Sequence, residues 1–442
     1  MSILLIRAEQ VVCLDAQDNI FQPGYLIVED DRIAEVGLQS RLGRRKFDRE
    51  IDLGLRLIMP GLVNAHTHSP MVLFRGLAEG HSLFQFEGWY NTIRVVEEVM
   101  DPDMIPDAVT ISCAEMIRTG TTCFADQYFW MDQIVPQVRK SGLRAALAYG
   151  IVELGDESAR EREVAAATTF LESLSGDPLI DGWVGPHALF VDNSEEAIQL
   201  ELALADRFDT GLHIHFGTSG EEDRYCQANY GRSAVQQMEE MGILKRRLLA
   251  AHCLTVPEKD LPTLGKYDFT VVVAASSCMR NAAGVAPVKA MLEAGINTAL
   301  GTDNVTNNNS YDLFKEMQIT GKLISLQERQ PNAIATRQIL EMATLGGARA
   351  LGLEDEVGSL EAGKIADLIS LDLEEIGWAP FGGQDVYTAL VYSVTGMHVR
   401  EVMVNGRWLL RDGRWTTLDY AQARRGLEAA YTELQKRITE AL

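Results

Sequence analysis

Short apolar runs alternate with longer amphipathic stretches through the middle of the chain, between residues 59 and 365. Runs at 211–215, 248–252 and 269–274 have the composition of buried parallel strands, and helical patterns such as that at 194–208 lie between such runs. Repeated strand–helix units over roughly 300 residues predict an α/β protein with a (β/α)8 barrel of the TIM type, whose active site forms where the strands end. A doubly wound parallel sheet is the alternative, but no Gly-x-Gly-x-x-Gly motif follows an early strand.

Both ends of the chain have a different residue pattern, with short β-rich runs and tight turns. Asn405-Gly406 lies between two apolar runs, and this pair is a strong signal for a β-hairpin because both residues accept a positive φ. Since chain termini often lie close together, we expect residues 1–58 and 366–420 to form one small β-domain beside a barrel domain at 59–365.

A helix is predicted at the C-terminal end, over residues 421–442. We expect its apolar face to dock on the rest of the protein rather than to carry chemistry. The side chains of this face recur at helical spacing: Leu427, Tyr431, Leu434 and Ile438.

The composition excludes several classes of protein. Apolar residues make up 46% and charged residues 23% of the 442 residues, which is a globular balance. The net charge of −23 repels phosphate backbones and anionic lipid, so we expect neither nucleic acid nor a membrane surface as a partner. Six scattered cysteines, an N-terminus without a signal-peptide pattern and no apolar stretch near the roughly 20 residues of a membrane span favour the cytoplasm.

Four of the eight histidines form two His-x-His pairs, His66/His68 and His213/His215. In a β-strand alternate side chains point to the same face, so each pair would present two imidazoles together. Two adjacent imidazoles are costly to protonate together, but a divalent cation binds both in the neutral form. Hydrogen-bonded core histidines are the alternative interpretation of either pair.

Two further residues, His252 and Asp303, each end an apolar run at the point where a strand would give way to a loop. In a barrel these residues would meet His66, His68 and His215 at one mouth, because all the strands end on the same side. Three imidazoles and one carboxylate with an open position for water are typical of a catalytic metal site rather than a closed structural one.

The segment Met59-Pro-Gly-Leu-Val-Asn-Ala-His-Thr-His68 resembles the first-strand motif of the amidohydrolase superfamily. More narrowly, the chain is similar to the branch that holds S-adenosylhomocysteine and methylthioadenosine deaminases, guanine-type deaminases and triazine hydrolases. The resemblance implies a (β/α)8 barrel with a β-sandwich built from both termini, one divalent metal ion, zinc or iron, and a homo-oligomer. Further matching motifs extend it over nearly the whole chain: Gly185-Pro-His-Ala188, Ala251-His252-Cys253, Gly301-Thr-Asp303 and the segment from Gly358 to Leu368.

The resemblance also implies roles for single residues. His252 matches a histidine that contacts the metal-bound water or the substrate, and His187 matches a substrate-contacting histidine. A bound cation lowers the pKa of water from about 15.7 toward 7; Asp303 can then accept the proton, and His252 can steady the developing tetrahedral centre. The metal ligands implied are His66, His68, His215 and Asp303.

One position departs from the deaminase pattern, which places a glutamate three residues after the fifth-strand ligand. Thr218 stands there, and a threonine hydroxyl relays a proton but does not store one as a carboxylic acid does. Glu79, Glu87 and Glu221 are candidate replacements, while Glu221 and Glu222 also match the acidic start of the next helix, where they would lie on its surface. We expect Thr218, Glu87 and His187 to contact the substrate.

The sequence therefore predicts a metal-dependent hydrolase that deaminates a small heterocyclic molecule of purine, pterin or triazine type. The aromatic residues in segment 80–90 suit stacking on a flat ring, although they could equally cap the barrel. Because Thr218 replaces the expected acid, displacement of a leaving group that needs no proton, such as chloride from a triazine-like ring, is the alternative. A non-catalytic binding protein with the same fold is a third reading, which the intact ligand set disfavours.

Overall fold

The computed structural model describes residues 2–174 and 176–441, and its centre is an eight-stranded parallel sheet. Each strand pairs with the next one along the chain, in the order β15 to β8. Asp303, just beyond the last strand, forms a parallel bridge with Thr67 in the first, and its N–H donates to the carbonyl of His66 at 2.9 Å. The sheet thus closes on itself, which confirms the barrel prediction. Its strands are β8 (Leu62–Thr67), β9 (Thr121–Tyr128), β10 (Arg144–Ile151), β11 (Ile180–Pro186), β12 (Leu212–Phe216), β13 (Leu248–His252), β14 (Phe269–Val273) and β15 (Asn297–Leu300).

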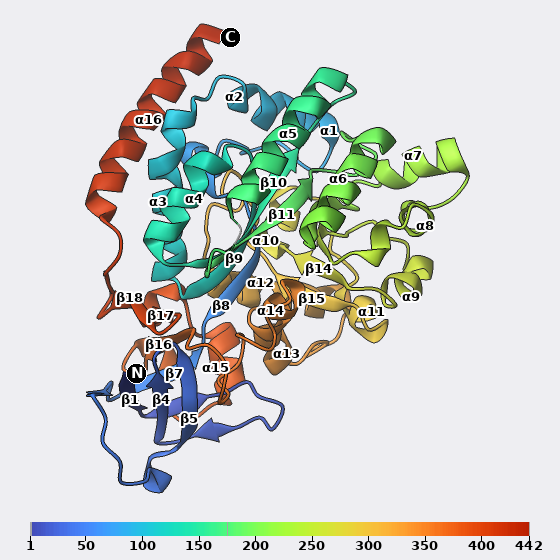
Figure 1. The fold of residues 1–442 in the computed structure, drawn as a ribbon. Coiled ribbons are helices and arrows are strands. Elements are labelled where there is room, and N and C mark those ends of the chain that lie inside the picture. Colours follow the sequence, from blue (N-terminus) through green and yellow to red (C-terminus); the bar gives the residue numbers. More distant parts are fainter. Residues whose placement is uncertain (1, 175, 442) are drawn as a thin grey trace.

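Helices surround the strands on the outside of this sheet (Figure 1). All eight residues of β9 and all eight of β10 are buried, as expected for strands covered by side chains on one face and helices on the other. The main helices of this layer are α3 (Ile105–Arg118), α4 (Met131–Ser141), α5 (Glu157–Ser173), α6 (Glu195–Phe208), α7 (Glu221–Tyr230), α8 (Ala234–Glu240), α11 (Val288–Glu293), α12 (Leu313–Gln327), α13 (Thr336–Met342) and α14 (Leu345–Ala350).

Two further sheets lie at one end of the barrel, at the bottom of Figure 1. One contains β1 (Ile3–Ala8), β4 (Gly24–Glu29), β5 (Arg32–Leu38) and β6 (Arg49–Asp52). The other mixes both ends of the chain, because β16 (Leu368–Asp372) pairs antiparallel with β7 (Arg56–Pro60). Its remaining strands are β2 (Gln10–Val12), β3 (Ile20–Phe21), β17 (Val399–Val404), β18 (Arg407–Arg411) and β19 (Arg414–Trp415).

The Asn405-Gly406 turn joins β17 and β18 as a hairpin in which Val404 faces Arg407. Both turn residues have positive φ, 51° and 71°, which is the geometry that makes this dipeptide a hairpin signal.

An ion pair connects the barrel to the mixed sheet. Arg144, the first residue of β10, donates from Nε to Asp367 Oδ2 at 3.0 Å, and Asp367 directly precedes β16. The other carboxylate oxygen accepts from the backbone N–H of Asn405 at 2.7 Å. Both charged side chains are almost fully buried, 7% and 1% exposed. Asp367 lies in the Gly358–Leu368 motif, and this contact gives that motif a structural role.

The C-terminal helix α16 (Tyr420–Ala441) runs along the side of the barrel and packs on α3 (Figure 1). Leu434 is fully buried, and Leu427 and Ile438 pack against the core, as the apolar spacing predicts. Tyr431 is 48% exposed and lies at the edge of this face, so the docking stripe is narrower than expected. Among the described residues, no helix is both long enough and apolar enough to cross a membrane.

Candidate metal and active site

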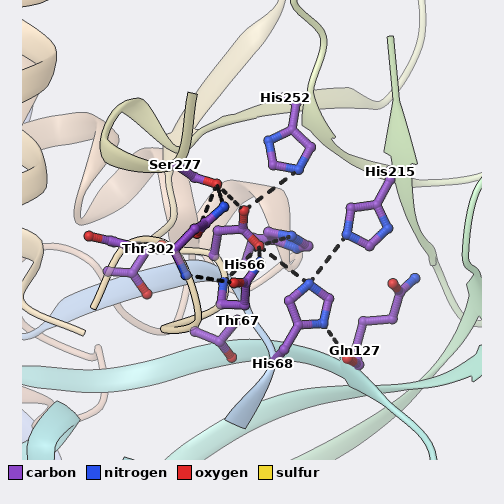
Figure 2. Close-up of polar contacts among 12 residues, drawn as sticks. His66, Thr67, His68, Gln127, His215, His252, Ser277 and Thr302 are labelled. Atoms are coloured by element: carbon purple, nitrogen blue, oxygen red, sulfur yellow. Dashed lines mark hydrogen bonds and ion pairs between the residues drawn. The ribbon is translucent and has the colours of Figure 1, made fainter. Parts of the chain in front are cut away.

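Three histidines and one aspartate meet at the mouth of the barrel where the strands end. One ligand atom from each of His66, His215, His252 and Asp303 lies within 4.8 Å of the others, a grouping that can hold a metal ion. His68 belongs to the same group, since its Nε2 lies 3.3 Å from Nε2 of His215 and 3.4 Å from Oδ1 of Asp303. Figure 2 shows His66, His68, His215 and His252 pointing toward this centre.

The strands explain why these residues meet. His66 lies in β8, His215 in β12 and His252 at the last position of β13, so parallel pairing brings their side chains to one end of the barrel. His252 and Asp303 have positive φ angles of 80° and 61° at the points where the chain leaves a strand. Side chains larger than glycine avoid this backbone region, and such strain is concentrated at functional sites.

The His66 ring is held from behind by His213. The Nδ1 atom of His66 and Nε2 of His213 are 2.7 Å apart, while Nε2 of His66 is buried without a hydrogen-bond partner and lies 3.4 Å from Asp303 Oδ1. A buried ring nitrogen without a partner is costly, and a cation at the centre would use its lone pair. His213, the first histidine of the His213/His215 pair, therefore supports the site rather than facing it.

His68 and His215 are oriented by backbone carbonyls. Nδ1 of His68 lies 2.7 Å from the carbonyl oxygen of Gln127, and Nδ1 of His215 lies 2.9 Å from that of His187. With Nδ1–H donating to a carbonyl, Nε2 of each ring keeps its lone pair directed at the centre, which is the usual outer arrangement of metal-binding histidines.

Asp303 is fixed through both carboxylate oxygens. Oδ1 accepts from the backbone N–H and the side-chain Nδ2 of Asn304, at 2.7 and 3.0 Å, and Oδ2 accepts from the hydroxyl of Ser277. Burial opposes ionisation, but the imidazoles of His66 and His68, each with Nε2 3.4 Å from Oδ1, and that of His252 hold the pKa of Asp303 well below its usual range. The carboxylate is therefore ionised at neutral pH.

The imidazoles of the cluster are mostly held neutral. Burial, reinforced by the neighbouring histidines, lowers the pKa of His215 and of His213 well below the usual value. Burial also lowers the pKa of His252 to about 3. For His68, burial is outweighed by the adjacent carboxylate of Asp303, so its pKa is raised. One carboxylate with several neutral imidazoles is the donor set that zinc and similar divalent cations prefer, and the residues fit such an ion.

Asp126, buried in β9, braces the chain segment that carries the first two histidines. Its carboxylate accepts from Oγ1 of Thr67 and from the N–H of Ser69, both at 2.6 Å. Burial raises the pKa of Asp126 despite these hydrogen bonds. Sequence reasoning missed Asp126 and Ser277, although both follow from the barrel, since one lies in β9 and the other just after β14.

A cavity opens above the histidine cluster, and aromatic side chains from segment 80–90 line one wall. The Trp89 ring centre lies 4.8 Å from that of His187, and the Phe84 ring centre lies 4.5 Å from that of His252. His187 is half-buried and its Nδ1 contacts the carboxylate of Asp192. This arrangement suits a flat ring that lies between aromatic side chains and the cluster.

The structure places the predicted substrate contacts differently. Thr218 and Glu221 line the cavity together with His187. Glu87 does not: it is exposed in the short helix α1 (Phe86–Trp89), whose Phe86 and Trp89 occupy the cavity wall instead. Glu79 is also exposed and pairs with Arg280.

Two glutamates line the cavity where sequence reasoning did not expect them. Glu222 was predicted on a helix surface beside Glu221, but it is only 2% exposed. Glu97, in the short helix α2 (Val95–Glu97), is 6% exposed and lies 3.7 Å from Nη1 of Arg94. An amphipathic pattern does not distinguish a carboxylate at a helix start that faces solvent from one that faces a cavity.

Comparison with known protein sequences finds a family match and close similarity to several enzymes. Residues 57–409 match the amidohydrolase family. A 5'-deoxyadenosine deaminase of Methanosarcina barkeri is 36% identical over 441 residues, which cover 99% of this chain and all of that protein. A 5-methylthioadenosine/S-adenosylhomocysteine deaminase of Moorella thermoacetica is 37% identical over 417 residues, 94% of each chain.

Solved structures also resemble this chain over almost its full length. An adenosine deaminase from Xanthomonas campestris with bound zinc has a TM-score of 0.91 at 29% identity and covers 98% of both chains. The atrazine chlorohydrolase TrzN from Arthrobacter aurescens, complexed with zinc, has a TM-score of 0.87 at 22% identity, with 97% of this chain and all of that one covered. At that lower identity the second likeness shows a common fold.

Proposed function

This chain belongs to the amidohydrolase family, and from that premise we propose that it is a zinc-dependent deaminase of a purine nucleoside of the 5'-deoxyadenosine type. The observation that supports it most is the cluster of His66, His215, His252 and Asp303 at the barrel mouth. Deaminases of adenosine analogues, similar to this chain over almost its full length, supply the substrate class.

The residues proposed to hold the cation are His66, His68, His215 and Asp303, with His252 beside it. When bound, zinc lowers the pKa of water from about 15.7 toward 7 and so provides a nucleophile at neutral pH. The identity of the ion as zinc is supported by the Xanthomonas campestris deaminase, whose structure contains it.

The chain's own residues handle protons and charge. Asp303 is ionised at neutral pH and can accept a proton from the attacking water, while Ser277 and Asn304 keep its carboxylate in place. His252 is neutral and buried, with Nε2 4.0 Å from Asp303 Oδ2, so it can stabilise negative charge that develops on the attacked carbon's oxygen.

The charge of the cavity favours an uncharged substrate. Among the described residues that line it, Arg94 is the one lysine or arginine, and it is paired with Glu97. The cavity's acidic residues are Glu97, Asp192, Glu221, Glu222 and Asp303. Such a lining repels phosphate, while carboxylates can accept the hydroxyl hydrogens of a sugar. We therefore propose neutral nucleosides as substrates and exclude nucleotides such as AMP.

The test is a panel assay on purified, zinc-loaded protein. Ammonia release should be fastest with 5'-deoxyadenosine or a similar neutral adenosine analogue, and AMP should be at least about tenfold poorer in kcat/KM, since close like charges cost a kcal/mol or more. Chelation should remove the activity and the bound metal together, and added zinc should restore both. Absence of ammonia release from every purine nucleoside, with one equivalent of zinc bound, would rule out the proposal.

Thr218 supports a second candidate, the displacement of halide from a heterocycle. Chloride is the anion of a strong acid and leaves without being protonated, so this reaction does not require the carboxylic acid that Thr218 replaces. Chloride release from a chlorinated triazine or purine, together with no ammonia from the amino analogue, would favour this function over deamination.

A further inference from the structure

The proposed deamination requires a proton donor that the family pattern would place at position 218. The amine is a poor leaving group until it is protonated and can leave as ammonia, and attack on the ring is favoured when the adjacent ring nitrogen accepts a proton. The Thr218 hydroxyl is half-buried in the cavity wall and carries no ionisable proton at neutral pH. A residue other than Thr218 must therefore supply this proton.

Four of the five carboxylates that line the cavity are already committed or poorly placed. Asp303 belongs to the histidine cluster, and Asp192 contacts Nδ1 of His187 and accepts from the N–H of Ala188 at 3.0 Å. Burial raises the pKa of Glu97 although the Arg94 guanidinium lowers it, but its carboxylate is already paired with that guanidinium at 3.7 Å. Glu221 is partly exposed at the first position of α7, where water can solvate its carboxylate.

Glu222 differs from all of these. Its Oε1 accepts from the backbone N–H of Gly217 at 3.0 Å, so its carboxyl reaches back along the loop to the residue that directly precedes Thr218. Its Oε2 is buried and has no hydrogen-bond partner. One oxygen is thus anchored, while the other is free to carry a proton at the cavity wall.

We propose that Glu222 is the general acid of this enzyme and replaces the glutamate that is absent at position 218. This inference rests on the proposed deaminase function. The oxygen of water bonds to the carbon that bears the amine, and the C=N π electrons move to the ring nitrogen, which takes one proton of that water by way of Asp303. Glu222 gives its proton to the amine, whose C–N bond breaks to release ammonia, and Glu222 regains the second proton of the water from the newly added hydroxyl.

The surroundings of Glu222 suit proton storage at neutral pH. Burial raises its pKa to about 7 and outweighs the hydrogen bonds from its own N–H and that of Gly217. Glu221 and Asp223 on the same helix add to this rise. Cys226 on α7 and Cys253 after β13 also lie near Glu222, and burial raises the pKa of both thiols, so they remain uncharged.

The experiment compares Glu222→Gln with the matched control Glu157→Gln, which changes an exposed glutamate at the first position of α5, outside the cavity. Glutamine keeps an oxygen that can accept from Gly217 N–H but has no transferable acid proton, so zinc content should match wild type and the variant should unfold at no lower temperature than wild type. For 5'-deoxyadenosine, we expect ammonia release by E222Q to fall about 10²- to 10⁴-fold, and release by E157Q to change by roughly threefold or less.

A substrate with chloride in place of the amine separates a catalytic role from a structural one. With 6-chloropurine riboside, E222Q should retain chloride release to within roughly tenfold of wild type, because chloride needs no proton to leave. Wild-type deamination should fall above a pH of about 7 as Glu222 loses its proton, and this basic limb should be absent from E222Q.

Two results would overturn the role of Glu222: ammonia release by E222Q within a few-fold of wild type, or equal losses of ammonia and chloride release. Both results are ratios of the rate of the variant to the rate of the wild-type protein. Wild-type protein that releases no ammonia from any nucleoside would instead refute the deaminase function itself, so the two failures are distinguishable.

Discussion

Replacing Asp367 by asparagine should destabilise the whole protein while leaving its chemistry intact. The change removes the negative charge from a buried ion pair, and Arg144 keeps its charge in surroundings where its side chain is only 7% exposed. Asparagine still offers an oxygen to the Asn405 N–H, so the hairpin contact can persist. The substitution therefore removes only the negative charge that compensates the guanidinium of Arg144.

The magnitude follows from burial. Breaking a buried pair by removing one partner costs about 3–5 kcal/mol in the free energy of unfolding, because the remaining charge is uncompensated. At about 2.1 cal/mol/K per residue, unfolding of 442 residues carries an entropy near 0.9 kcal/mol/K, so the midpoint should fall by about 3–5 °C.

Thermal unfolding of the zinc-loaded protein, followed by circular dichroism, measures this shift. The control is Glu172→Gln, which breaks the exposed pair with Arg207, where both side chains are more than half exposed. A surface pair contributes about 1 kcal/mol or less, so its midpoint should move by about 1 °C or less. Adding Arg144→Met to Asp367→Asn removes the orphaned charge and should recover most of the loss.

The reasoning is refuted if Asp367→Asn shifts the midpoint no more than the surface control does, or if Arg144→Met adds a further loss. Turnover at low temperature provides a separate check. Arg144 begins β10, at the opposite end of the strand from the histidine cluster, so kcat should stay near the wild-type value.

Further expectations concern the site itself. Asp303→Asn removes the anionic member of the cluster, so zinc content by elemental analysis and turnover should both be lost; full zinc occupancy would contradict its role as a ligand. His213→Phe removes the hydrogen-bond partner of His66 Nδ1 and should weaken zinc affinity about 10- to 100-fold in a chelator competition, whereas unchanged affinity would make His213 a mere packing residue. Glu222→Gln should change the pH dependence of stability: folding raises the pKa of Glu222 from 4.5 to about 7, so wild-type stability is full below pH 4.5 and is lost as the pH rises to 7. The variant lacks this loss and should be more stable by about 3 kcal/mol at pH 8 but equal at pH 4, and parallel stability curves for the two proteins would exclude this linkage.

Much of the fold could be predicted from the sequence because its signals are local and periodic. The runs at 211–215 and 248–252 lie within a residue of β12 and β13, and Asn405-Gly406 forms the predicted hairpin. The two His-x-His pairs predicted shared strand faces, and this follows from the two-residue repeat of a strand without any knowledge of neighbours.

The burial of a side chain and its partners across the barrel could not be predicted from the sequence in the same way. Sequence spacing treats His213 and His215 alike, but the barrel directs one behind His66 and the other into the metal cluster. Glu87 and Glu97 both lie near the aromatic segment, and only the folded chain shows that Glu87 is exposed while Glu97 lines the cavity.

The sequence by itself determined the strand–helix order, the ends of the strands and the residue types gathered there, since these depend on neighbours along the chain. The tertiary structure alone decided which carboxyl can act as an acid beside Thr218. Glu221 and Glu222 are adjacent glutamates at one helix start. Glu221 is partly exposed, whereas Glu222 is buried and its Oε1 accepts from the N–H of Gly217. Burial raises the pKa of Glu222, and this desolvation is a property of the surrounding fold and not of the local sequence.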